Sequence, residues 1–503
     1  MTIPNDPSGC TNTSLPTFRY AASSGKVQKG RLYAESPGCF TMTDIYNWRG
    51  TVSSGGVLSS KGPIFQLGDD GAVLETVGAI GEPVTNKWLL AAELYVTNGA
   101  TFYCKGAEAG GDCDELRIQS VDSEDWYELR GHGGSLYFES TIVTSWDTPR
   151  RRPQTEHEGG RSFLNCVSEK LSDPPETCTG RAKAERGECR MDIIKSEMAY
   201  LGFFDSESYG LSWKVRGFCV DLSNHEIFTT TNVYGDIKDS DIHHNYYGHY
   251  SYGHQGGVWT NNKMHDNFQY GFDPHDDSDY LEIAHNEVYN NANHGIIASK
   301  RCNNVRIHHN QVSNGGPMAV GIFLHRSSDE AEVFENEIWD MQDAGIAFME
   351  SMNGDIHDNE IRNCRMGIRL SMGSAGNQVY NNVFDSLTDV GLNTYRGTRG
   401  LNDPTSGIYN IVRDGHPHEN VFANNQILNT KQGTKFKDCQ DLVLTGNVFT
   451  GTDELEVYDA QNTLWRNNDV PSSACLDIVE TDDGLPIPIS TFANDSDELP
   501  SEC

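Results

Sequence analysis

The sequence lacks any apolar run long enough to cross a membrane, and it is poor in positive charge. No stretch of about 18 apolar residues occurs, so we expect no membrane-spanning helix. Only 38 Lys and Arg residues stand against 72 Asp and Glu residues, for a formal net charge of −34. This balance argues against nucleic acid as a partner. A polyanionic substrate would need cations concentrated locally in a groove.

The chain also lacks an apolar leader and paired metal-binding cysteine motifs. It begins MTIPNDPSGC, which we interpret as a mature or a recombinant start from which any secretion signal has been removed. Zinc is the rival interpretation of the 13 cysteines, but no CxxC…CxxC spacing is present. We predict local disulfides among Cys104 and Cys113, and among Cys166, Cys178 and Cys189. Disulfides favour a secreted, extracellular protein of a cell wall or matrix.

A short repeat fills the second half of the chain. Its unit is an aliphatic or aromatic residue, two further residues and an Asn, with most steps between 19 and 26 residues. The repeated residues are Asn245, Asn267, Asn286, Asn310, Asn336, Asn359, Asn382, Asn424, Asn447 and Asn468. This period is typical of a solenoid, and the LxxLxL frame of leucine-rich repeats is missing. We predict an all-β fold, a right-handed parallel β-helix in which the Asn side chains form an internal ladder.

The repeat sets the predicted organisation of the chain as a single domain. We expect an N-terminal cap in residues 1–30, the β-helix in residues 31–470 and an acidic C-terminal tail in residues 471–503. Cys475 or Cys503 would pin this tail. The one long step of the repeat contains YRGTRGLNDPTSG, which we interpret as a loop.

A second register starts at a glycine in each coil, some nine residues after the Asn. Positions one and three after the glycine are mostly apolar and should face the core, so positions two and four should face outward. Adjacent coils lie about 4.8 Å apart, so outward residues form columns. Position four carries Tyr252, His275, Ser299, His325, Met349 and Ser371; position two carries Tyr250, Asp273, Ile297, Phe323, Ala347 and Arg369; position five carries Asp276, Lys300, Arg326 and Glu350.

The stretch QYGFDPHDDS, residues 269–278, gathers a Tyr, a His and three acids on one coil. Such a cluster could be a solvated turn, a metal site or a proton-transfer site. Carboxylates and His can hold calcium or manganese, but no nonapeptide Gly-Asp calcium repeat is present. The predicted line of aromatic, acidic, imidazole and cationic groups favours proton transfer on a linear polymer.

These motifs resemble one enzyme family. YGFDPHDDS followed by HGIIASK, GIFLHR, FMES and GIR is similar to the mannuronan C-5 epimerases of brown algae and of the bacterial periplasm. The similarity runs from TIVTSWD at Thr141 to Leu370, nearly half the chain. The resemblance implies a right-handed β-helix that converts β-D-mannuronate to α-L-guluronate within intact mannuronan or alginate. We expect a monomer that requires no cofactor, and leave dependence on Ca²⁺ open.

The chemistry of epimerisation assigns roles to these residues. A base removes the C-5 proton, a donor returns one from the opposite face, and a cation neutralises the substrate carboxylate. By resemblance, His275 is the expected base, with Asp273 and Asp276 orienting its ring. Tyr270 matches the acid of the extended-type epimerases, and Tyr252 is its competitor from the His275 column.

The neutralising position carries a departure from the family. The periplasmic enzymes have an Arg where this chain has Lys300, followed here by Arg301. Lys offers a point charge in place of a bidentate fork, so substrate alignment could also use Arg326 or Asn293. We expect a structural role for His294. The remaining predicted substrate contacts are Tyr250, Asp276, Arg301, His325, Arg326, Arg369 and His254.

Three other functions fit parts of the pattern. A polyuronate lyase forms the same carbanion but expels the 4-oxygen. A non-catalytic carbohydrate-binding or spike-like β-helix would need no base. Hydrolysis by paired carboxylates is the weakest, because the coils that flank Asp273 carry Tyr250 and Ile297 at that position.

The proposed base predicts a pH dependence. An imidazole accepts a proton only when it is neutral, and His ordinarily titrates near pH 6.5. Initial rates measured on polymannuronate should therefore fall as the pH is lowered through that range. A flat profile between about pH 5 and 8 would contradict the role of His275.

Overall fold

A computed structural model describes residues 14–22, 29–51, 63–74, 85–169, 186–216, 227–397, 415–478, 492–494 and 501–502. The chain forms two compact units, Met1–Phe268 and Gln269–Cys503. Apart from the helices α1 (Met42–Thr51) and α2 (Ile227–Thr230) and the 3-10 turn η1 (Ala107–Ala109), the elements found in these residues are strands. Neither α-helix has the length and apolar character needed to span a membrane.

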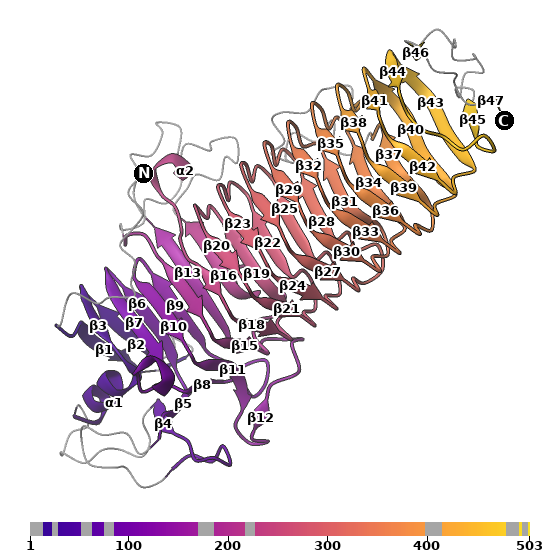
Figure 1. Cartoon of the computed structure of the whole chain (residues 1–503). Helices are drawn as coiled ribbons and strands as arrows, with labels where there is room; N and C mark the ends of the chain where they lie inside the picture. Colours follow the sequence, from indigo (N-terminus) through magenta and orange to yellow (C-terminus); the bar gives the residue numbers. More distant parts are fainter. Residues whose placement is uncertain are drawn as a thin grey trace. The chain divides into compact units, whose positions relative to one another are not determined.

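In the second unit, successive coils give one strand to each of three parallel sheets (Figure 1). The first sheet holds β22 (Phe272–His275), β25 (Ile296–Ser299), β28 (Ile322–His325), β31 (Ala344–Met349), β34 (Met366–Ser371), β37 (Val390–Tyr395), β40 (Gln432–Gln440), β43 (Glu454–Gln461), β45 (Cys475–Ile478) and β47 (Ser501–Glu502). The second holds β23 (Glu282–Ala284), β26 (Arg306–His308), β29 (Glu332–Phe334), β32 (Asp355–His357), β35 (Gln378–Tyr380), β38 (Val421–Ala423), β41 (Val443–Thr445), β44 (Thr463–Arg466) and β46 (Phe492–Asn494).

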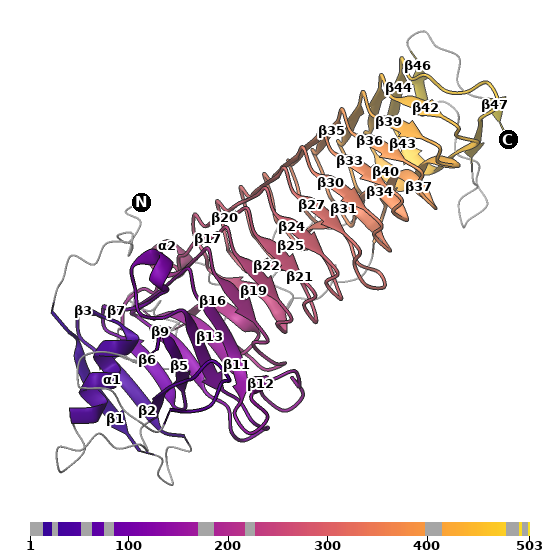
Figure 2. The same cartoon turned by 60° about the horizontal axis from the view of Figure 1, so that its bottom comes forward.

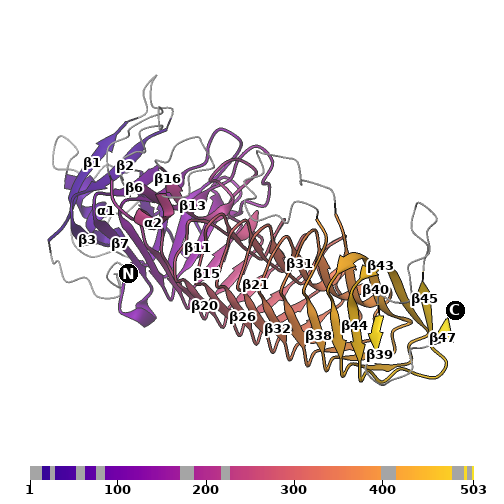
Figure 3. The same cartoon turned by 90° about the horizontal axis from the view of Figure 1, so that it is seen from above.

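The third sheet of the second unit closes each coil. It holds β24 (Glu287–Tyr289), β27 (Gln311–Ser313), β30 (Glu337–Trp339), β33 (Glu360–Arg362), β36 (Val383–Asp385), β39 (Gln426–Leu428) and β42 (Val448–Thr450). Figure 3 shows β26, β32, β38 and β44 following one another along this unit. The predicted parallel β-helix is confirmed.

The first unit has the same three-sheet plan with less regular coils. One sheet holds β1 (Thr17–Ala21), β2 (Arg31–Glu35), β6 (Glu93–Thr97), β9 (Glu128–His132), β13 (Phe163–Glu169), β16 (Gly210–Arg216) and β19 (Tyr247–Tyr252). Another holds β3 (Gly38–Phe40), β7 (Ala100–Lys105), β10 (Ser135–Glu139), β14 (Met191–Ile194), β17 (Ile237–Lys238) and β20 (Val258–Thr260). The last holds β4 (Ile64–Gln66), β5 (Lys87–Leu90), β8 (Glu115–Gln119), β11 (Ile142–Asp147), β15 (Glu197–Ala199), β18 (Asp241–His243) and β21 (Lys263–His265), with β12 (Arg152–Pro153) paired to β11.

The start of the first unit departs from parallel pairing. β1 runs antiparallel to β2, and β4 runs antiparallel to β5. Helix α1 lies beside β3 (Figure 2), where its Trp48 packs against Phe18 and its Tyr46 against Trp88. These aromatic contacts join α1 to β1 and β5 at the start of the coils. The predicted boundaries at residues 30 and 470 stay predictions.

The predicted alternation of the first sheet holds on its inner side. Ile296, Ile322, Ile346 and Ile368, which follow the coil glycines, are all 0% exposed. The outer side is less open than alternation alone suggests. Ile297, Phe323 and Ala347 at position two join a buried outer cluster with Val320, Ala344, Met366 and Val390. The first sheet of the second unit is therefore packed on both faces over these coils.

The predicted Asn ladder is present and continuous through the second unit. Each side-chain amide donates to the Oδ1 atom of the Asn on the next coil at 2.9–3.0 Å, through Asn286, Asn310, Asn336, Asn359, Asn382, Asn425, Asn447 and Asn468. These amides are buried, so the ladder satisfies polar groups that water cannot reach.

One residue of the predicted ladder was wrong. The sequence VFANN allows two frames, and the ladder uses Asn425 rather than Asn424. Phe422, three residues before Asn425, is 0% exposed and fills the aliphatic or aromatic position of the repeat. Asn424 is exposed and takes the turn conformation with φ of 53°. Burying the larger side chain decided the frame.

Two of the predicted local disulfides are present. Cys104 bonds to Cys113, and Cys166 bonds to Cys189. Cys178 and Cys503 lie outside the described residues, and Cys475 is disulfide-bonded. Cys302 and Cys364 are buried thiols.

The ladder frame can be tested with two adjacent substitutions. Asn425→Ala removes a donor to Asn447 and leaves buried groups of its neighbours unpaired, so it should lower the free energy of unfolding by about 2–4 kcal/mol. Asn424→Gly, at an exposed residue with positive φ, should change it by less than about 1 kcal/mol. Thermal unfolding of the two variants measures the difference, and equal losses would contradict the assigned frame.

Candidate active site

The strand register of the second unit builds the predicted column. His275 pairs with Ser299, Ser299 with His325, and His325 with Met349. These residues end β22, β25, β28 and β31, just before the chain turns away from the sheet. The next residue on each coil, Asp276, Lys300, Arg326 or Glu350, has positive φ. A column of charged side chains thus lies beside the column that contains His275.

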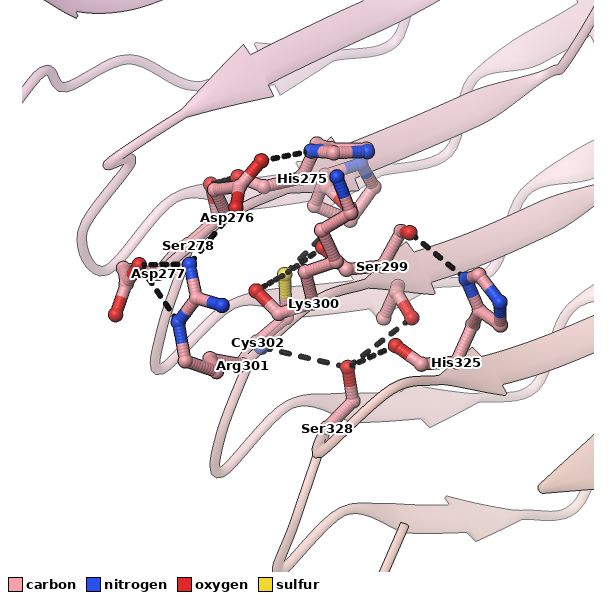
Figure 4. Close-up of polar contacts among 12 residues, drawn as sticks. His275, Asp276, Asp277, Ser278, Ser299, Lys300, Arg301, Cys302, His325 and Ser328 are labelled. Atoms are coloured by element: carbon pink, nitrogen blue, oxygen red, sulfur yellow. Dashed lines mark hydrogen bonds and ion pairs between the residues drawn. The ribbon is translucent and has the colours of Figure 1, made fainter. Parts of the chain in front are cut away.

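A hydrogen-bonded chain fixes the His275 ring (Figure 4). Nδ1 of His275 bonds to Oδ2 of Asp276, and Oδ1 of Asp276 accepts from Arg301 at 2.8 Å. Arg301 also donates to Asp277 at 2.9 Å. The hydrogen bond from His275 and the charges of His275, Lys300 and Arg301 outweigh the effect of burial and lower the pKa of Asp276. Asp276 is therefore a carboxylate held on both sides.

The position of Arg301 changes its expected role. Its guanidinium is committed to Asp276 and Asp277, and its side chain is 13% exposed. Arg301 and Asp276 were predicted to contact substrate. We propose instead that both residues position His275. The His275 side chain itself is 22% exposed, and its Nε2 atom is the nitrogen opposite the one that Asp276 anchors.

Asp273 was expected to face outward, but its side chain is not open to solvent. It is only 3% exposed because the outer side of its sheet is packed. Burial raises the pKa of its carboxyl to about 7, against the opposing charge of His275 and with the help of the charge of Asp276. Within the described residues its carboxyl forms no hydrogen bond. It acts on His275 through charge.

Two cations next to His275 are less committed than Arg301. Figure 4 shows the Lys300 side chain running toward the His275 ring from the next coil. No ion pair or hydrogen bond of the Lys300 ammonium or of the Arg326 guanidinium is found among the described residues, and Arg326 Nε is buried. Both cations remain available to an anionic ligand.

His325 is a neutral ring near both cations. Its Nδ1 is 3.0 Å from Oγ of Ser299 (Figure 4). Burial and then the charge of Arg326 lower its pKa well below the usual value. A neutral imidazole next to Lys300 and Arg326 can serve as a hydrogen-bonding group without adding charge.

Glu350, which the sequence register places at position five without a role, has unusual surroundings in the structure. It is 2% exposed, and neither of its carboxyl oxygens has a hydrogen-bond partner in the described part of the chain. Burial raises its pKa to about 7, although the charge of Arg326 opposes this. Its place at position five, one coil beyond Arg326, was the signal that could have identified it.

Farther along the coils, Arg369 is tied to an acid that the sequence analysis did not assign. Its guanidinium donates to Asp343 at 2.5 Å, and Asp343 also pairs with Arg365. The Arg369 side chain is 12% exposed and lies over the Phe323 ring. A distant subsite at Arg369 stays a prediction.

Tyr270 and His294 form a stacked pair at the other end of these strands. Their ring centroids are 5.5 Å apart, and Nδ1 of His294 accepts the Val320 amide at 2.9 Å. Burial, with the charge of Arg369, lowers the pKa of His294 to about 4. His294 is therefore a neutral ring that stacks on Tyr270. Nearby, Nδ2 of Asn293 lies 3.5 Å from Oε1 of Gln269.

Three predicted residues belong to the first unit. His254 is 0% exposed, lies between Trp213 and Trp259, and donates to the Gly235 carbonyl at 3.0 Å, so its predicted substrate contact was wrong. The turn at Gly253, with φ of 77°, directs it inward. Tyr250 packs against Tyr209 and Tyr252 against Phe228. Their proposed parts in catalysis rest on the sequence register alone.

Comparison with known sequences gives one family and several relatives. Residues 212–416 match the family described as periplasmic copper-binding protein (NosD). The chain is 34% identical over 170 residues to a mannuronan C5-epimerase of Pseudomonas syringae pv. tomato, covering 34% of this chain and 31% of the relative. It is 33% identical over 300 residues to one from Pseudomonas putida, covering 59% and 52%.

A third relative and a solved structure agree with these matches. The mannuronan C5-epimerase AlgG of Azotobacter vinelandii is 29% identical over 318 residues, covering 61% of this chain and 53% of the relative. The chain thus spans at most about half of the lengths of these relatives. The crystal structure of the periplasmic alginate epimerase AlgG superposes with a TM-score of 0.60 at 21% identity, covering 86% of this chain and 85% of that one. The resemblance found in the sequence is confirmed, and the structural match shows the same fold.

Burial of Asp273 predicts a pH-dependent stability. Because the folded state raises this pKa from 3.8 to about 7, the fold binds the proton more tightly than the unfolded chain does. The free energy of unfolding should fall as pH rises from about 4 to 7, by at most about 4 kcal/mol from this group. Asp273→Asn cannot ionise, so its melting temperature relative to the parent should be higher at pH 8 than at pH 5. Asp355→Asn, at an exposed residue, is the control, and an equal offset at both pH values would contradict the assignment.

Proposed function

We propose that this chain is a mannuronan C-5 epimerase, which converts β-D-mannuronate to α-L-guluronate within the polymer. The observation that carries the proposal is the anchored His275 next to the uncommitted ammonium of Lys300. Similarity to relatives named mannuronan C5-epimerase supports the same reaction. The substrate class would be a polyanionic polysaccharide, mannuronan or alginate.

His275 is the proposed base. A carboxylate only accepts hydrogen bonds, so the bond to Asp276 keeps the proton of a neutral ring on Nδ1. The Nε2 atom then carries the lone pair and takes the C-5 proton. Asp276, held by Arg301, stabilises the imidazolium that forms, and the nearby carboxyl of Asp273 adds to this effect when it is ionised.

Lys300 is the proposed neutralising group. Removal of a proton alpha to a carboxylate builds a second negative charge on the substrate, and a preorganised cation lowers the barrier to this step. Lys300 lies one coil from His275, which suits a single sugar ring. Arg326, another coil away, would hold the carboxylate of a neighbouring residue of the polymer. His325, near these two cations, would serve as a neutral hydrogen-bonding group.

Reprotonation requires a donor on the opposite face of the sugar. Tyr270 is the first candidate, since its ring orientation is fixed by stacking on His294. Tyr252 is the second and rests on the sequence register. The Phe substitutions of the two tyrosines separate these candidates, because only loss of the proton donor should abolish turnover while polymer binding is kept.

The proposal also covers the cellular location, the oligomeric state and the cofactor requirement of the protein. An exported compartment fits the two disulfides, and the match to a periplasmic epimerase supports the periplasm over an extracellular matrix. We propose that the protein acts as a monomer without a required cofactor. Parallel reactions with a chelator or with added Ca²⁺ would test for ion dependence.

Incubation with polymannuronate tests the function directly. Proton NMR of the anomeric region should show guluronate signals at constant chain length, without the rise in ultraviolet absorbance that unsaturated ends produce. Rising absorbance with shorter chains would instead identify a lyase. If the polymer stays unchanged, both enzymatic reactions are contradicted and polysaccharide binding is the remaining function.

Variants tie the activity to the site. His275→Gln should lower the rate by roughly 10²–10⁴-fold. His357→Gln, on the second sheet of the same unit, is the matched control and should keep the parental rate. Lys300→Ala should lose more activity than Lys300→Arg, because Arg keeps the charge. Equal rates for His275→Gln and the parent would contradict the mechanism.

A further inference from the structure

Three histidines gather on a turn that the proposed reaction does not use. His308 ends β26 and His309 follows it, while His285 lies at the same turn of the preceding coil. Each offers one ring nitrogen, and these three atoms all lie within 4.8 Å of one another. Among the described residues this is the one group of three His, Cys, Asp or Glu side chains with such a geometry.

The backbone under this cluster is rigidly set. His285 and His309 have φ of 57° and 53°, and each directly precedes a ladder residue, Asn286 or Asn310. The His285 amide donates to the His308 carbonyl at 3.2 Å. The rings of His285 and His309 have centroids 4.7 Å apart, and the His308 ring stacks on Phe334. The three imidazoles are thus held by the coil repeat and not by a loose loop.

The hydrogen bonds of the cluster leave two lone pairs facing each other. Nε2 of His308 is 3.3 Å from Glu282, and Nε2 of His309 is 2.6 Å from Glu335. Carboxylates only accept, so in the neutral rings these Nε2 atoms carry the hydrogens. Both Nδ1 atoms are then acceptors, yet they lie 3.0 Å apart. A metal ion, or a proton shared by the two nitrogens, would satisfy such a pair.

We propose that His285, His308 and His309 bind a divalent transition-metal ion of the zinc, copper or nickel class. Imidazole nitrogen suits these ions, and nitrogen–metal distances of about 2.0–2.1 Å require the ring nitrogens to lie roughly 3.3 Å apart in a tetrahedral site. The 3.0 Å pair is close to this spacing, and a ring nitrogen of exposed His285 lies within 4.8 Å of a ring nitrogen of each of the other two histidines. Glu282 and Glu335 orient the rings from behind, as carboxylates do in His-ligated metal sites.

The first unit holds a natural comparison for this site. The repeat IHHN occurs there too, and Nδ1 of His243 is 2.8 Å from Nδ1 of His244. The third ring, His265, has its two nitrogens bonded to Asp266 and Asp241 at 2.6 and 2.9 Å. Because both nitrogens of His265 are bonded to carboxylates, only two nitrogens are left there for a metal ion. Two ligands bind a metal ion more weakly than three, so the His243 and His244 pair is the matched control.

Titration of the full-length, untagged and chelator-treated protein with Zn²⁺ tests the proposal. Calorimetry should find one site with a dissociation constant in the micromolar range or tighter. Co²⁺ in place of Zn²⁺ should give the visible absorption of a nitrogen-ligated ion. His309→Gln and His285→Gln should each weaken binding by at least about tenfold, whereas His244→Gln should leave it unchanged.

Two results would overturn the site. Absence of Zn²⁺ and Co²⁺ binding by the parent protein would show that a proton, shared between His308 and His309, satisfies the pair instead. Equal loss of binding in His244→Gln and His309→Gln would place the metal elsewhere. Either result leaves the proposed epimerase reaction untouched, because that reaction is measured separately on polymannuronate.

Discussion

Parallel pairing between successive coils is the constraint on which the structure of the second unit depends. Each strand bonds to the same position of the next coil, so a residue and its counterpart about 22–26 residues later lie one strand spacing apart. The buried Asn ladder reinforces this register from the inside. The repeat period therefore determines which side chains of neighbouring coils lie next to each other.

The same register arranges charge along one edge of a sheet. Asp276, Lys300, Arg326 and Glu350 occupy equivalent positions on four successive coils. The two cationic side chains thus lie between two acidic ones. The two outer acids lie at opposite ends of a cationic centre. A chain with a net charge of −34 thus places two cations on adjacent coils at one edge of a sheet.

The sequence predicted the features that follow from period and alternation. The fold class, the inward isoleucines and the column from His275 to His325 came from counting residues alone. Features that depend on packing between layers were not predictable in this way. Burial of Asp273 follows from the buried outer cluster, and the inward turn of His254 follows from a glycine conformation. Arg301 was assigned to substrate because its partners, Asp276 and Asp277, are adjacent only once the coils stack.

One rung of the ladder connects residues much farther apart in sequence than the others. Asn382 donates to Asn425 at 3.0 Å across 43 residues, whereas the other rungs keep 2.9–3.0 Å across 21 to 26 residues. Extra length at that turn leaves the spacing of the stack unaltered. Insertions of different length can therefore be accepted there without disturbing the coils that carry the candidate active site.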